Sequence, residues 1–268
     1  MHVDYLYEQG TGQLNEDFYF TNGSLFGVFD GATSLTKDLY ENDLTGGFLA
    51  SNIAGDTFSK NNSSLIDLAE KANLKISDAM LKRGVNINSK ENLWSTSFAV
   101  VRIHEERFQW VQTGDCLVLA IYNDDSFEVL TKGFDHDLET LMMWKEISAS
   151  SDATILEKMS KKIAEVRSQM NVTYGVLNGE KEALNFLRIG EKSLKGIKNI
   201  IIFTDGLFIP KENPEDKEDF NLFTSLYLKG GLHNVKDYIR ALEETDNNCT
   251  IFPRFKTHDD IAAVSLTF

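Results

Sequence analysis

The chain has 268 residues, 42% of them hydrophobic and 11% aromatic, with 41 Asp and Glu against 27 Lys and Arg, a formal net charge of −14. This apolar content excludes disorder over the whole chain and suits one large domain or two small ones. The negative charge disfavours unaided binding to nucleic acid or to an anionic membrane, so we expect neither as a partner. Cys116 and Cys249 form no CxxC pair, and no signal peptide or membrane span is evident, so we expect a cytoplasmic protein.

The stretch NEDFYFTNGSLFGVFDGAT, residues 15–33, predicts two apolar strands joined by a tight turn. Asn22-Gly23 is the strongest short-range hairpin signal, because a type I′ turn needs positive φ at both central residues. A two-residue loop at this dipeptide pairs Tyr19 with Phe26 and Asp17 with Val28.

This register puts the carboxylates of Asp17 and Asp30 on one face of the hairpin. As diagonal neighbours, their Cβ atoms would lie roughly 7–8 Å apart or somewhat less, which suits two metal ions about 3.5–4 Å apart. Two buried carboxylates without a cation would be costly. We therefore expect a divalent metal pair here, and the alternative is that both are ordinary solvated loop residues.

Apolar spacing predicts a helix from about Asp43 to Phe58 and a second helix between an N-cap at Ser64 and Gly84. The second helix carries an apolar stripe that is more typical of core than of a cofactor site: Leu65, Leu68, Ala69, Ala72, Ile76, Ala79 and Met80. Three β-rich runs, residues 95–103, 107–122 and 126–131, are joined by short polar turns and predict an antiparallel meander.

The second half of the chain alternates between helical and strand patterns. Residues 136–170 look helical, residues 197–206 form a buried strand ending in a turn, residues 232–244 predict a helix, and residues 261–268 predict a closing strand. Hairpins mixed with segregated helices favour an α+β fold. Because no repeat or linker divides the sequence, we expect a single domain over residues 1–268.

Further acidic residues stand where predicted strands begin or end: Asp115 after Gly114, Asp205 in TDG, and Asp259-Asp260 before the last strand. Taken singly, each is explained as a turn or a solvated surface residue. Hard divalent cations prefer such oxygen donors, and no His or Cys cluster in the sequence offers a softer ligand set.

Together and in this order, the segments NEDFYF, VFDGAT, VQTGDCLVLAIY, IIIFTDGLF and HDDIAAVSL resemble the metal-dependent protein serine/threonine phosphatases of the 2C type. The resemblance spans nearly the whole chain, and TKGFDHDLETL is similar to the family's Thr-x-Asp-His stretch. It implies a four-layer α/β/β/α sandwich with two antiparallel sheets. It also implies a hydrolase that dephosphorylates phosphoserine and phosphothreonine in proteins, with a water activated by two Mn²⁺ or Mg²⁺ ions.

The resemblance also implies residue roles. Asp30 would bridge both ions and the Gly31 carbonyl would bind one of them, while Asp205 and Asp259 would complete the ligands of the other. These three aspartates are therefore the expected catalytic residues. Remaining metal contacts would come from Glu16 and Asp17, directly or through water, and from Asp115 at a third, weaker site.

Two positions on the substrate side depart from the family pattern. The histidine of the usual DGHGG is Ala32 here, and the arginine that many members place four residues before the first motif's glutamate is Gly12, next to a neutral Gln13. His258, and less plausibly His136, could supply a proton instead, although a solvated or core imidazole is the ordinary alternative. These departures leave two other functions open: a catalytically weak metal-binding regulatory module, and a phosphatase of small phosphate esters.

Overall fold

The structure is a computed structural model that describes residues 1–35, 38–60, 63–131, 135–148 and 154–268. Its strands are β1 (His2–Glu8), β2 (Phe18–Asn22), β3 (Leu25–Gly31), β4 (Thr96–His104), β5 (Arg107–Thr113), β6 (Leu117–Tyr122), β7 (Phe127–Val129), β8 (Arg188–Ser193), β9 (Ile197–Phe203) and β10 (Ile261–Thr267). Its α-helices are α1 (Gly46–Ser59), α2 (Leu65–Lys82), α3 (Leu138–Ile147), α4 (Ile155–Lys158), α5 (Ser160–Ser168) and α6 (Phe220–Glu244). Short 3₁₀ turns are η1 (Glu41–Asp43), η2 (Lys90–Asn92), η4 (Lys181–Phe186) and η5 (Asp205–Leu207).

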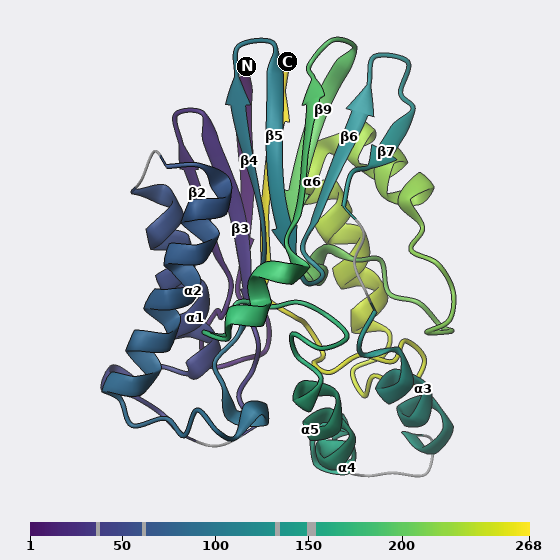
Figure 1. The fold of residues 1–268 in the computed structure, drawn as a ribbon. Coiled ribbons are helices and arrows are strands. Elements are labelled where there is room, and N and C mark those ends of the chain that lie inside the picture. The colour runs from purple at the N-terminus through teal and green to yellow at the C-terminus, as the bar shows by residue number, and fades with distance from the viewer. Residues whose placement is uncertain (36–37, 61–62, 132–134, 149–153) are drawn as a thin grey trace.

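The strands form two five-stranded sheets, ordered β1-β10-β9-β6-β7 and β2-β3-β4-β5-β8. Every pairing within them is antiparallel. The sheets pack face to face, with α1 and α2 outside the second sheet and α6 outside the first (Figure 1). The predicted four-layer α+β sandwich is therefore confirmed.

Both faces of each sheet are apolar, which is why helices cover the outer faces. Along β3, Phe26 and Val28 point into the core between the sheets, because successive side chains of a strand alternate faces. Phe29 points the other way and packs against Phe58 of α1 and Phe98 of β4, with ring centroids 5.6 Å away in each case.

The hairpin of β2 and β3 exists, but the predicted register is wrong by two residues. Asn22 pairs with Leu25 and Tyr19 pairs with Val28, so the loop consists of Gly23 and Ser24. Only Gly23 of these two has positive φ, which fits a type II′ turn and not type I′. Asn22 is held in the strand because its side-chain amide donates to the carbonyl of Ser59 at the end of α1.

An even shift leaves every side chain on its predicted face. Continuing the observed register by one step beyond the Phe18–Phe29 pair puts Asp17 opposite Asp30. The two carboxylates are therefore cross-strand neighbours and not diagonal ones.

The predicted meander is wrong between β5 and β6. β4 and β5 form a hairpin, but β6 pairs with β9 and β7 in the other sheet. The chain changes sheets at Gly114, whose φ of +76° favours glycine and where a Cβ would lie 2.2 Å from the Cβ of Ser97.

The helix predictions hold with changed boundaries. Thr45 caps α1 by accepting the backbone N–H of Phe48, so this helix starts later than the predicted Asp43. Ser64 caps α2 as predicted, and the whole apolar stripe is buried. The last helix, α6, begins twelve residues before the predicted residue 232 and is kinked at Gly230 and Gly231, and β8 was not predicted.

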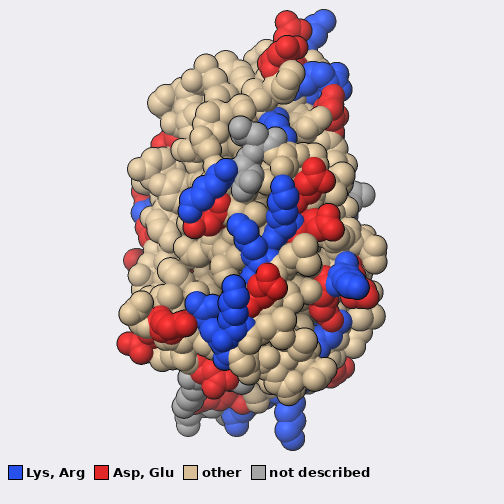
Figure 2. Space-filling model, turned by 60° about the vertical axis from the view of Figure 1, so that its left-hand side comes forward, with Lys and Arg blue, Asp and Glu red and all other residues tan. Residues whose placement is uncertain are grey.

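Charges of both signs are spread over the surface. On the described part of the face in Figure 2, Lys and Arg side chains lie among Asp and Glu side chains. In the described residues, no helix is long and apolar enough to cross a membrane.

Candidate active site

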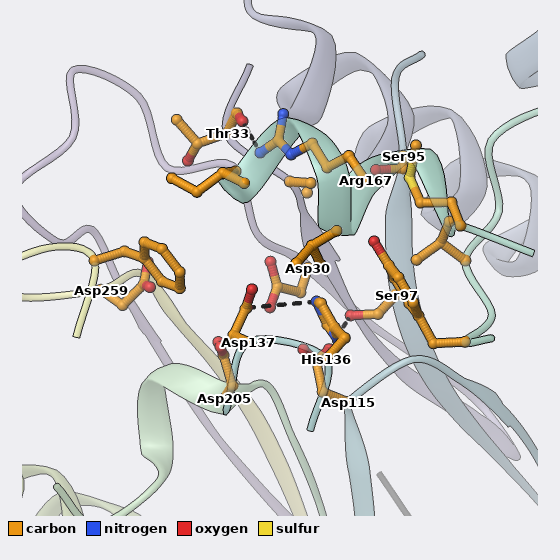
Figure 3. A pocket seen from close by; sticks show the side chains of 18 of the residues that line it. Asp30, Thr33, Ser95, Ser97, Asp115, His136, Asp137, Arg167, Asp205 and Asp259 are labelled. Atoms are coloured by element: carbon orange, nitrogen blue, oxygen red, sulfur yellow. Dashed lines mark hydrogen bonds and ion pairs between the residues drawn. The ribbon is translucent and has the colours of Figure 1, made fainter. Parts of the chain in front are cut away.

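Four strand ends meet at one edge of the sandwich, the lower edge in Figure 1. β3 ends there at Gly31, β9 ends at Phe203, β10 begins at Ile261, and the chain passes between the sheets at Gly114-Asp115. A cavity of about 140 Å³ opens at this edge. Of the residues predicted from the sequence, it brings together Asp30, Gly31, Asp115, Asp205 and Asp259 (Figure 3).

The carboxyl groups of Asp30 and Asp205 face one another at the centre of the site. Burial raises the pKa of Asp30 well above its ordinary value, and the nearby charges of Asp205, Asp17 and Asp115 raise it further. Burial, Asp259 and Asp115 likewise raise the pKa of Asp205. Carboxylates this close repel one another when ionised, unless a cation lies between them.

Asp17 lies behind this pair and does not line the cavity. Its side chain is buried and accepts a hydrogen bond of 2.7 Å from the hydroxyl of Thr204, the residue before Asp205. Burial raises the pKa of Asp17, the Thr204 hydrogen bond opposes this rise, and the charges of Asp259, Asp260 and Asp205 add to it. Asp17 therefore lies outside the wall of the cavity that Asp30 lines, and a metal site shared by the two stays a prediction.

Glu16 does not line the cavity, and its carboxylate lies between the segment after β3 and the start of α1. Its two carboxylate oxygens accept from the hydroxyl groups of Thr33, at 2.5 Å, and Thr45, at 2.6 Å. The carboxylate of Asp260 is also structural in this arrangement, since it accepts the backbone N–H groups of Gly10 and Glu16 at 2.7 and 2.9 Å. Glu16 therefore joins the segments around the site, and its charge also raises the pKa values of the cavity residues Arg167 and Lys256.

Lys256 is a cation within the acidic cluster. Its Nζ lies 2.7 Å from a carboxylate oxygen of Asp259 and 4.0 Å from one of Asp260. Burial alone would lower the pKa of Lys256, but Asp259 and Asp260 raise it above its ordinary value. The ammonium group therefore partly compensates the charge of the cluster on the Asp259 side.

Asp115 and Cys116 follow the crossing between the sheets. The Ser97 hydroxyl donates to Asp115 at 2.6 Å, which fixes that carboxylate at the cavity wall. The Cys116 thiol is buried, and burial raises its pKa, so it is unsuited to act as a nucleophile.

The donor set fits hard divalent cations. Mg²⁺ is commonly bound by one or two carboxylates, with water and phosphate oxygens completing the shell. Among the described residues, no three His, Cys, Asp or Glu side chains meet closely enough to hold one ion by themselves. Pairs of carboxylates such as Asp30 with Asp205, together with the Gly31 carbonyl, suit ions that keep waters, and Lys256 already occupies one oxygen of Asp259.

Of the two histidines considered as proton donors, His136 lines the cavity and His258 does not. The His136 imidazole stacks on the Tyr174 ring, with centroids 4.2 Å apart and planes 4° apart, and its Nε2 lies 3.4 Å from the carboxylate of Asp137. The cavity position therefore favours His136 over His258, the reverse of the order expected from the sequence, and burial together with the charges of Arg240 and Arg254 lowers the pKa of His258. The Thr-x-Asp-His likeness covers Thr131 and His136, while residues 132–134 lie outside the described residues.

Sequence reasoning missed Arg167, Lys256, Asp137 and Tyr174 as cavity residues. Lys256 stands three residues before Asp259, and this proximity in sequence was an available signal. Arg167 and Tyr174 have no such signal, because only the fold brings α5 and the segment after it to the cavity at the end of β3.

Comparison with solved structures extends over the whole chain. Neither a protein-family model nor a curated protein matches the sequence. The Mycobacterium tuberculosis serine/threonine phosphatase PstP superposes with a TM-score of 0.60 at 13% identity, covering 98% of this chain and 97% of that one. The Staphylococcus aureus serine/threonine phosphatase Stp1 gives 0.60 at 17% identity, covering 99% and 94%.

This chain has the fold of bacterial serine/threonine phosphatases. The catalytic domain of PstP is also known in complex with two manganese ions, and that structure matches with a TM-score of 0.59 at 11% identity, covering 98% of this chain and 96% of the other. At these identities the likeness establishes the fold, and the activity of this chain has to be argued from its own residues.

Proposed function

We propose that this protein is a metal-dependent phosphatase that hydrolyses phosphoserine and phosphothreonine in proteins. The observation that carries the proposal is the convergence of Asp30, Asp115, Asp205 and Asp259 on one cavity, on a fold shared with bacterial serine/threonine phosphatases. The manganese complex of PstP supports two divalent cations, Mn²⁺ or Mg²⁺, as the cofactors.

The acidic residues in and around the cavity each have a task in this proposal. Asp30, Asp205 and the Gly31 carbonyl would hold the two cations, with Asp259 contributing when Lys256 releases one of its oxygens. When bound, such ions supply a nucleophilic water near neutral pH and neutralise phosphate oxygens during in-line displacement. Asp17 lies behind the cavity as a buried carboxyl group positioned by Thr204, and Glu16 holds the segment after β3 against the start of α1.

The proposal has three further parts, which concern a third metal site, the location and the number of domains. A third, weaker metal site beside Asp115 rests on the family resemblance alone. A cytoplasmic location is supported by Cys116 and Cys249, both of which are free thiols. A single domain over residues 1–268 is supported by the superpositions on PstP and Stp1, which cover nearly all of this chain and nearly all of each of those chains.

The first experiment is hydrolysis of p-nitrophenyl phosphate by the purified protein with Mn²⁺, with chelator, and in an Asp30→Asn variant. We expect metal-dependent turnover that falls by about 10²-fold or more in the variant, since electrostatic groups at the reacting centre contribute on this scale. Turnover that survives the chelator would contradict the proposal.

Two alternatives are decided by related measurements. Ala32 stands in the cavity wall where the family places a histidine, and this departure, together with Gly12, is what motivates a regulatory module with little turnover as an alternative. Metal binding without hydrolysis of any phosphate ester would establish that module. A large preference for sugar phosphates or nucleotides over phosphoserine and phosphothreonine peptides would instead favour small esters as substrates.

A further inference from the structure

The cavity contains an arginine that comes from a different part of the chain than the family's phosphate-binding arginine. Arg167 lies in α5, in the connection between β7 and β8, and its side chain lines the cavity together with Asp30, Thr33 and Asp205. Figure 3 shows the guanidinium group beside Thr33, across the cavity from Asp115 and Asp205. Gly12, where an arginine was expected, does not line this cavity.

The positive charge of Arg167 is poorly compensated by its surroundings. One of its terminal nitrogens donates to the carbonyl oxygen of Thr33. Within the part of the chain that the structure describes, no carboxylate forms an ion pair with this guanidinium group. Burial lowers the pKa of Arg167, and the neighbouring Tyr174, Asp137 and Glu16 oppose that effect.

Lys256 is the other cation of the cavity wall, and it is already engaged. Its ammonium group is paired with Asp259 at 2.7 Å. Arg167 is therefore the cavity cation that has no carboxylate partner among the described residues. A guanidinium group presents five N–H donors in a planar fork that matches two oxygens of a phosphate group.

Two hydrogen bonds fix where the fork lies. Arg167 bonds the carbonyl of Thr33, and the Thr33 hydroxyl bonds a carboxylate oxygen of Glu16 at 2.5 Å. Thr33 is three residues after Asp30, so the arginine is tied to the segment that directly follows the strand of the central carboxylate. A phosphate group beside Asp30 and Asp205 would lie within the cavity that Arg167 also lines.

We propose that Arg167 is the residue that binds the phosphate group of the substrate, in place of the arginine absent at Gly12. The inference rests on the proposed phosphatase function, because it assumes that a substrate phosphate group binds in this cavity. The ligand is then a dianionic phosphate monoester, and the guanidinium group of Arg167 in α5 binds two of its oxygens.

The test compares Arg167→Gln and Arg167→Lys with the wild type and with Lys161→Gln. Lys161 is exposed on the same helix, so its variant removes one positive charge near the site without changing the cavity wall. Two quantities are measured in Mn²⁺: the KM for p-nitrophenyl phosphate, and the affinity for inorganic phosphate by calorimetry.

We expect the glutamine variant to raise both KM and the phosphate dissociation constant about tenfold or more, the cost of losing a hydrogen-bonded charge. The lysine variant should recover part of the loss because it keeps the charge but not the fork, and Lys161→Gln should match the wild type. A purely structural role would instead lower the melting temperature or the Mn²⁺ affinity of Arg167→Gln at unchanged phosphate affinity, and that result would overturn the inference.

The two measurements separate this inference from the proposed function. Wild-type protein that binds phosphate through Arg167 but does not hydrolyse esters would support the inference and contradict the function. Wild-type turnover with an unchanged KM and phosphate affinity in both variants would leave the function in place and overturn the inference. If Arg167→Gln does not fold, Arg167→Lys alone decides the test. An unchanged KM and an unchanged phosphate dissociation constant in Arg167→Lys would then overturn the inference.

Discussion

Asp17, Asp30 and Asp205 illustrate how the site depends on single residues. Asp17 is buried, Asp30 and Asp205 are half-buried, and burial together with the charges of neighbouring carboxylates raises the pKa values of all three. A raised pKa means that the folded protein keeps protons that the unfolded chain has released above about pH 4. The free energy of unfolding contributed by these groups is therefore present at low pH and is lost as pH rises through their folded-state pKa values.

From this sign we predict that the protein in chelator melts at a lower temperature at pH 8 than at pH 5.5. Mn²⁺ should raise the melting temperature more at pH 8, because only ionised carboxylates bind the cation well. The measurement is thermal unfolding at both pH values, with and without Mn²⁺. Asp30→Asn cannot ionise at this position, so both the effect of pH on the melting temperature and the extra stabilisation by Mn²⁺ at pH 8 should be smaller in this variant. An identical pH dependence of the melting temperature in the wild type and the variant would contradict the account.

At the scale of elements, the segment between α6 and β10 positions Lys256 and Asp259. Its anchor is Asp246, whose buried carboxylate accepts the backbone N–H groups of Thr250, Ile251 and Phe252 at 2.8 to 3.1 Å and pairs with Arg254 at 2.9 Å. Burial alone would raise the pKa of Asp246, but these backbone hydrogen bonds and Arg254 hold it below its ordinary value.

We predict that Asp246→Asn lowers the free energy of unfolding by about 3 kcal/mol, because it leaves the Arg254 charge buried without its partner. Denaturant unfolding measures this change. The control is Asp237→Asn on α6, where an exposed carboxylate pairs with Lys236 and the same chemical change should cost less than about 0.5 kcal/mol. Equal effects of the two substitutions would show that the 246–260 segment is not held by Asp246.

The elements themselves were largely predictable, and their connections were not. The 3.6-residue stripe of α2 and the caps at Ser64 and Gly84 are local signals, and the structure follows them. The register of the β2–β3 hairpin depends on a hydrogen bond from Asn22 to Ser59, at the end of α1. The change of sheet after β5 depends on the pairing of β6 with β9, which is far away in the sequence. Both are long-range contacts, which local sequence patterns do not carry.

On the scale of the whole molecule, the site exists because two sheets end at the same edge. Asp30 comes from the end of β3 in one sheet, and Asp205 and Asp259 come from the ends of β9 and β10 in the other. These aspartates could be predicted as site residues from the sequence, because their motifs follow one another along the chain in the same order as in the 2C-type phosphatases. Arg167 and Tyr174 could not, since they enter the cavity through the connection from β7 to β8, which the sequence marks only as helical.

The central claim is that carboxylates from both sheets form one divalent metal site, and calorimetric titration of the chelator-treated protein with Mn²⁺ tests it most directly. The account predicts binding of two ions by the wild type. It also predicts loss of at least one of them in Asp30→Asn, from the first sheet, and in Asp205→Asn, from the second. The absence of Mn²⁺ binding by the wild type, or wild-type binding in both variants, would contradict it.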